Sequence, residues 1–307
     1  MSSPTGPASG LPVRMPRPRQ PGRHRRPEPL AAPEGAPALV LAVPGTPGTA
    51  TRSLAEEVVS IARSELPGLD ARIGYLDGDD NEYPSLQIVL THAAEERTAR
   101  YERALAVGVD AKEPEGPAAV VVPLLAGPDG ALLRRLRQAV MDSRVAAELT
   151  DVLGPHPLLA EALHVRLSEA GLARADRARL FTVATAADGI ILASVGGDEA
   201  VQAAGITGML LAARLAVPVM AAALDQEGSI ASVAEQLRSS GSQQLALAPY
   251  LIGPEIEPAL IEEAAGEAGC PASEPLGPYP AIGKLALAKY TTALGITPQP
   301  AQGTPAR

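Results

Sequence analysis

The sequence of 307 residues has few aromatic residues and a single cysteine. Aromatic residues make up 2% of it, with no tryptophan and one phenylalanine, so a core must be built from Ala, Val, Leu and Ile. The lone Cys270 excludes an internal disulfide and a metal site made of cysteines alone. No apolar run reaches the ~20 residues that cross a bilayer, and the basic N-terminus lacks the apolar core of a secretory signal. We therefore expect a cytoplasmic protein without a membrane segment.

Most of the chain has no excess of positive charge and is net negative. Residues 1–36 contain six arginines and two glutamates, whereas the whole chain has a net charge of −9, so the remainder carries −13. Such an acidic body argues against a nucleic-acid groove, which needs clustered Lys and Arg. Residues 1–36 are rich in Pro and Arg and residues 296–307 lack apolar periodicity, so both are predicted to be disordered tails. The basic run Arg23–Arg26 fits either a solvated tail or an arm for an anionic partner.

Short apolar runs alternate with amphipathic helical patterns along the rest of the chain. The runs of strand length are Ala38–Val43, Ala71–Leu76, Ala118–Leu125, Val145–Val152, Gly189–Val195, Val217–Leu224, Gln244–Ile252 and Ala272–Glu274. Strands that alternate with helices at this spacing predict right-handed βαβ units. The fold class is therefore α/β, with mostly parallel sheets flanked by helices.

The order of motifs repeats in the second half of the chain. Leu153–Pro157 (LGPHP) matches Leu276–Pro280 (LGPYP), and Pro123–Pro128 (PLLAGP) matches Pro249–Pro254 (PYLIGP). A repeat on this scale predicts two homologous halves, at 37–172 and 178–295. A cleft between the halves is then the expected pocket.

The chain resembles the class II tetrapyrrole chelatases, the sirohydrochlorin cobalt- and ferrochelatases, over about residues 38–294. The resemblance is carried by the strand end Val120–Gly127, the run Leu153–Leu163 and its echo Glu274–Pro280. It implies insertion of a divalent metal, Co or Fe, into a sirohydrochlorin-like tetrapyrrole without ATP, in cobalamin or siroheme biosynthesis. The metal is then a substrate, and no resident cofactor is implied.

The resemblance also implies a histidine after the first strand and another after the third. The first position is occupied by Pro44, and the stretch Ala126–Ala131 contains no histidine. Imidazole can coordinate a divalent metal and accept a pyrrole proton, whereas proline can do neither. Two hypotheses follow. One is a chelatase with an altered metal site, and the other is a non-catalytic relative that binds a tetrapyrrole or a protein partner and serves a regulatory role.

Carboxylates are the remaining candidates for metal ligands. Asp129 follows the third strand of the first half, and Glu255 and Glu257 follow the matching strand of the second half. Their oxygens can hold a divalent ion, but acidic residues also stabilise helix starts without any further function. His92, His156 and His164 are expected to be structural, with His156 at the start of a helix.

Two turns are candidates for binding the carboxylates of a macrocycle. Gly45 and Thr46 follow the first strand, and Ser194 and Gly196 follow the matching strand of the second half. Each turn precedes a helix, whose first backbone N–H groups attract anions.

Overall fold

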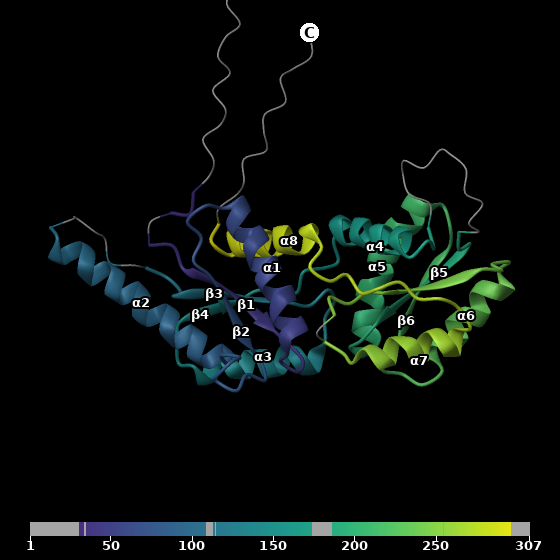
Figure 1. Cartoon of the computed structure of the whole chain (residues 1–307), viewed down its shortest axis with the longest axis horizontal. Helices are drawn as coiled ribbons and strands as arrows, with labels where there is room; N and C mark the ends of the chain where they lie inside the picture. Colours follow the sequence, from purple (N-terminus) through teal and green to yellow (C-terminus); the bar gives the residue numbers. More distant parts are fainter. Residues whose placement is uncertain are drawn as a thin grey trace, which may run out of the picture.

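The computed structural model describes residues 31–33, 35–108, 113, 115–173, 186–253 and 255–295. The predicted tails 1–36 and 296–307 lie almost entirely outside these residues. The described chain forms two α/β lobes side by side, each with a sheet between layers of helices (Figure 1). No helix in the described part of the chain is long and apolar enough to cross a membrane.

The first lobe is built on a parallel sheet with strand order β2-β1-β3-β4. Its strands are β1 Ala38–Val43, β2 Ala71–Tyr75, β3 Ala119–Pro123 and β4 Ala147–Leu149. The intervening helices are α1 Thr49–Glu65, α2 Leu86–Ala106 and α3 Gly130–Asp142. The central strands β1 and β3 are buried on both faces, which explains their unbroken apolar sequences.

The second lobe has a three-stranded parallel sheet with strand order β6-β5-β7. Its strands are β5 Gly189–Ser194, β6 Val219–Ala223 and β7 Leu245–Pro249, and its own helices are α5 Gly197–Leu215, α6 Ser229–Ser239 and α7 Pro258–Ala268. The strand expected at Ala272–Glu274 is reduced to one bridge between Leu247 and Ala272. Pro271 and Pro275 flank this segment and have no N–H to donate, so the ladder cannot extend.

Each lobe takes its last helix from the other half of the sequence. Helix α8, Pro280–Ala293, packs against α1 and over β1 and β3 of the first sheet. Helix α4, Pro157–Glu169, packs against α5 and β7 of the second lobe. The repeat in sequence is therefore not a simple division in space, and the chain crosses between the lobes twice.

The exchange of helices joins the two lobes through one hydrophobic layer. Side chains of α1, α8, α4 and α5 form a single buried cluster against both sheets. On the opposite faces the clusters are separate, with α2 and α3 under the first sheet and α6 and α7 under the second. The two lobes therefore share a hydrophobic layer on one side of the sheets. On the other side, α3 and α7 lie near the boundary between the lobes (Figure 1).

Candidate functional site

The carboxyl ends of β3, β5 and β7 meet at the junction of the two lobes. A cavity of about 10 Å³ lies there, lined by residues of both lobes that include Asp129, Ser194, Tyr250 and Glu255. This volume is enough for about one water molecule. Of the sequence candidates, the structure brings Asp129, Ser194 and Glu255 to one place.

Tyr250 directly follows β7, and its side chain packs closely against Gly127 and Gly154 of the first lobe. Its ring is 1% exposed, and a Cβ on Gly127 would lie 3.2 Å from it. Its hydroxyl lies 3.1 Å from the hydroxyl of Thr207 on α5, and burial raises the pKa of the phenol to about 12. Tyr250 therefore stays neutral and acts as a packing residue. Sequence reasoning missed it, although it directly follows a buried strand.

A second close approach closes the junction at the start of α5. Gly196 has a φ of +119°, and a Cβ there would lie 2.4 Å from the carbonyl oxygen of Pro128. Only glycine fits this backbone conformation and this contact. The turns after β3 and β5 therefore touch each other, which leaves little open space between the strand ends.

Asp129 is the N-cap of α3. One carboxylate oxygen accepts hydrogen bonds from the backbone N–H groups of Ala131 and Leu132, at 2.8 and 2.9 Å. This is the stabilising role expected of an acidic residue at a helix start. Asp129 is also one of the residues that line the cavity.

Glu255 lies across the cavity from Asp129 and is the most perturbed acid of the site. Its two oxygens accept hydrogen bonds from the N–H groups of Ile252 and Gly253, at 2.8 and 2.6 Å. Burial, the largest cause, together with the nearby charge of Asp129, raises the pKa of Glu255 to about 7, against the lowering effect of these hydrogen bonds. A carboxyl group with this pKa can bind and release a proton near neutral pH.

Two solved structures have the same arrangement of elements. One is the sirohydrochlorin chelatase SirB from Bacillus subtilis subspecies spizizenii in complex with cobalt, with a TM-score of 0.52 and 12% identity over 84% of this chain and 96% of that one. The other is CbiX, described as the terminal enzyme for siroheme biosynthesis in denitrifying bacteria, with a TM-score of 0.51 and 16% identity over 83% and 99%. The chain has the fold of the sirohydrochlorin chelatases. No protein-family model and no curated protein matched the sequence.

Within this chelatase fold, the strand end that holds Pro44 lies apart from the cavity. Pro44 is buried, and Gly45 after it has a φ of +80°, as a tight turn requires. Thr46 is exposed, and Gly48 is the N-cap of α1, which has no side-chain cap hydrogen bond. The first N–H groups of α1 therefore have no side-chain acceptor among the described residues.

The matching turn after β5 is already occupied by a carboxylate of the protein itself. Asp225 accepts hydrogen bonds from the N–H groups of Gly196 and Gly197, at 3.0 and 3.2 Å. Ser194 is 2% exposed, and its hydroxyl lies 3.4 Å from the carbonyl oxygen of Ala222. An anion from outside would have to displace Asp225, so the two candidate turns of the chelatase fold are not equivalent.

The remaining polar candidates lie outside the cavity. His156 caps α4 by accepting a hydrogen bond from the N–H of Leu158 at 3.1 Å, as its position in the sequence suggested. Nδ1 of His164 lies 2.8 Å from Nε of Arg214, and His92 is exposed on α2. Glu257 is exposed at the start of α7. Among the described residues, no group of three or more His, Cys, Asp or Glu is arranged to hold a metal.

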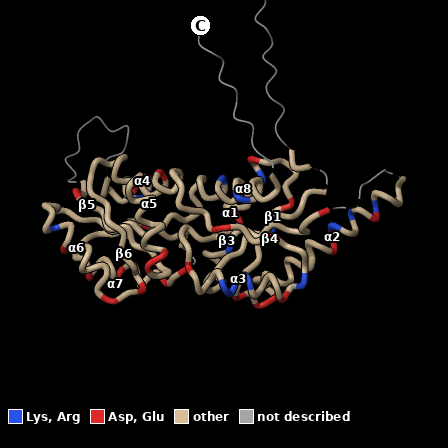
Figure 2. The backbone as a smooth tube through the Cα atoms, turned by 180° about the vertical axis from the view of Figure 1, so that it is seen from behind, with Lys and Arg blue, Asp and Glu red and all other residues tan. Residues whose placement is uncertain are grey.

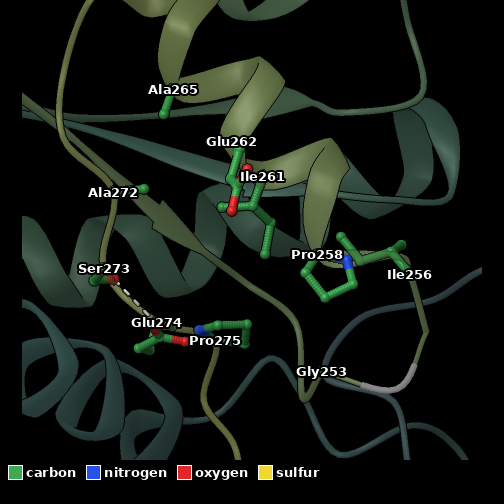
Figure 3. Close-up of a pocket in the computed structure, with 10 residues that line it drawn as sticks. All are labelled: Gly253, Ile256, Pro258, Ile261, Glu262, Ala265, Ala272, Ser273, Glu274 and Pro275. Atoms are coloured by element: carbon green, nitrogen blue, oxygen red, sulfur yellow. Dashed lines mark hydrogen bonds between the residues drawn. The ribbon is translucent and has the colours of Figure 1, made fainter.

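A larger pocket of about 460 Å³ lies on the other side of the turn that carries Glu255. It is bounded by Gly253, the start of α7 and the segment that includes Ala272 and Pro275 (Figure 3). Glu262 and Glu274 line it and no basic residue does. A macrocycle with many carboxylates would be repelled there, so we do not assign this pocket to a tetrapyrrole.

The raised pKa of Glu255 predicts a pH-dependent stability. The folded state holds the Glu255 proton more tightly than the unfolded state, so stability should fall as pH rises from about 4.5 through about 7. Glu255→Gln removes the charge but also one acceptor of a backbone hydrogen bond. We expect it to raise the free energy of unfolding at pH 8 by about 2 kcal/mol and to have much less effect at pH 5. Urea titrations at both pH values measure this, and an equal effect at both would contradict it.

Proposed function

We propose that this protein inserts a divalent metal ion, Co or Fe, into a sirohydrochlorin-like tetrapyrrole in the cytoplasm, with carboxyl groups in place of imidazoles. The observation that supports the proposal is the meeting of Asp129 and Glu255 at the strand ends of both lobes, in a fold shared with sirohydrochlorin chelatases. Because the cavity has room for about one water molecule, the macrocycle would lie across its mouth and not inside it.

Metal insertion replaces two pyrrole protons by one divalent ion, so the site needs a metal ligand and a proton acceptor. A carboxylate oxygen of Asp129 would bind the incoming ion. Glu255, with a pKa of about 7, would accept the two pyrrole protons one after the other and pass each to water, as a neutral imidazole could. The uncapped turn at Gly45 and Thr46 would hold a peripheral carboxylate of the macrocycle through the first N–H groups of α1.

Metal insertion can be followed by absorbance with sirohydrochlorin and Co²⁺ or Fe²⁺. We expect turnover above the spontaneous rate, a loss of roughly 100-fold in Glu255→Gln, and a similar loss in Asp129→Asn, which keeps an oxygen for the helix cap. Glu257→Gln is the matched control, because Glu257 is exposed and does not line the cavity. Absence of turnover in the unmodified protein would refute the catalytic proposal.

A second candidate is a relative that binds a tetrapyrrole without inserting metal. It is favoured by the absence of a three-residue metal cluster among the described residues and by the backbone hydrogen bonds that both carboxylates already accept. Absorbance titration with free and metallated macrocycle separates the two. A spectral shift without turnover supports this candidate. If the macrocycle causes no spectral shift and no thermal stabilisation of the protein, this candidate is contradicted as well.

A further inference from the structure

Helix α5 exposes an apolar face that is unusual for a surface helix. No charged residue occurs between Glu199 and Arg214, although the body of the protein is acidic. The exposed fractions are 44% for Ile206, 66% for Met209 and 40% for Leu210, and their spacing places them on one face of the helix. The buried face of α5 packs on α4 and the sheet, so the helix is apolar on nearly all sides. A face of this kind is typical of an interaction surface.

The same edge of the second lobe also has an unprotected strand. β6 pairs only with β5 among the described strands, and α5 lies mainly over β6. Val219, Met220 and Ala221 are half-buried, and β6 contains no charge, proline or bulge of the kind that protects an edge strand. The exposed face of α5 and the free edge of β6 are therefore neighbours, and neither has a partner within the described chain.

We propose that this face binds a second copy of the chain, with the two α5 helices antiparallel about a twofold axis. The charges at the ends of α5 favour this partner, since Asp198 and Glu199 at its start would come near the end of the other helix, where Arg214, whose Nε donates to His164, carries a positive charge. The middle carries no charge, so two identical faces do not repel each other. A pairing centred between Thr207 and Gly208 places Ile206 opposite Met209 of the other copy.

The outer surface of α5 has the shape needed for such a contact. A Cβ on Gly205 would meet no atom within 4 Å, and Ala213 is exposed, so small residues lie beside the large ones. Large side chains of one helix can then fit against small residues of the other, as in close helix pairs. Gln202 lies opposite Ala213 of the other copy in the same pairing.

Sedimentation velocity over a concentration series tests the proposal. We expect the unmodified protein to dimerise at micromolar concentration and Met209→Glu to raise the dissociation constant at least 100-fold. Met141→Glu on α3 is the matched control, because Met141 is 70% exposed and outside this face. A monomeric unmodified protein, or equal effects of the two variants, would overturn the proposal. Thermal unfolding of each variant checks that the monomer remains folded.

Cross-linking tests the antiparallel arrangement separately. In a Cys270→Ser background, mild oxidation should join Gln202→Cys in one copy to Ala213→Cys in another, but should join neither variant to itself. Self-linking of Gln202→Cys alone would indicate parallel helices and would refute the proposed geometry. Neither result depends on metal insertion, so these experiments test the dimer independently of the proposed activity.

Discussion

Replacing Arg97 with methionine is expected to lower the free energy of unfolding by about 3 kcal/mol. Arg97 lies on α2 and is 8% exposed, without an acidic partner for its guanidinium in the described chain. Its donors reach four backbone carbonyls, those of Pro117 at 2.6 Å, Glu115 at 2.8 Å, Gly116 at 3.2 Å and Gly35 at 3.4 Å. Methionine fills similar space but leaves these carbonyls without donors.

The side chain of Arg97 joins the segment before β1 and the segment before β3 to one helix. Burial, the largest cause, lowers its pKa, as expected for a cation held by dipoles and not by an opposite charge. Arg103→Met on the same helix is the control, because Arg103 is exposed and, among the described residues, its side chain donates only to the carbonyl oxygen of Ala99 one turn earlier. Urea unfolding should show a loss for Arg97→Met and less than about 0.5 kcal/mol for Arg103→Met. Equal losses would show that the four carbonyls contribute nothing specific.

Gly283→Ala is expected to destabilise the protein by a similar amount, about 3 kcal/mol, although alanine is the better helix former. A Cβ at Gly283 would lie 2.6 Å from Cβ of Ile61 and 2.9 Å from the carbonyl oxygen of Val58, both on α1. Since real carbon atoms do not approach so closely, α8 would have to move away from α1. The shared hydrophobic layer of the two lobes would then lose contacts along this pair of helices.

The control for this prediction is Gly266→Ala. Gly266 lies inside α7, and a Cβ there would meet no atom within 4 Å. The substitution should therefore stabilise the protein by about 0.5–1 kcal/mol through helix propensity and lower chain entropy. Thermal unfolding of both variants measures these two opposite changes in stability. Stabilisation by Gly283→Ala would show that α8 is not held closely against α1.

The proposed activity differs from the metal-binding pattern implied by the resemblance in the kind of side chain used. A carboxylate and a neutral imidazole can both accept a proton near pH 7, but the carboxylate only when burial raises its pKa. Glu255 meets this condition because it lies under the turn after β7, facing Asp129. The absence of a histidine directly after β1 is therefore compatible with proton transfer by Glu255 in the second lobe.

Local pattern was sufficient to predict the α/β class, because buried parallel strands need continuous apolar runs and crossover helices need an apolar stripe. β1 is expected at Ala38–Val43 and occurs at those residues. A structural role for His156 at a helix start was also expected from its place beside a proline, and the structure shows that this role is to cap α4. Asp129 and Glu255 were candidates in the sequence because each follows a matching strand.

Only the tertiary structure decided which candidates meet. The exchange of α4 and α8, the Tyr250 side chain between the lobes and the contact of Gly196 with Pro128 all join residues far apart in sequence. The same contacts bring Glu255 to Asp129 and leave Glu257 outside. The occupation of the second turn by Asp225 likewise depends on β6 lying beside β5. Spacing along a chain determines periodicity and local caps, whereas burial, pKa and the filling of a cleft depend on packing between elements that the spacing does not encode.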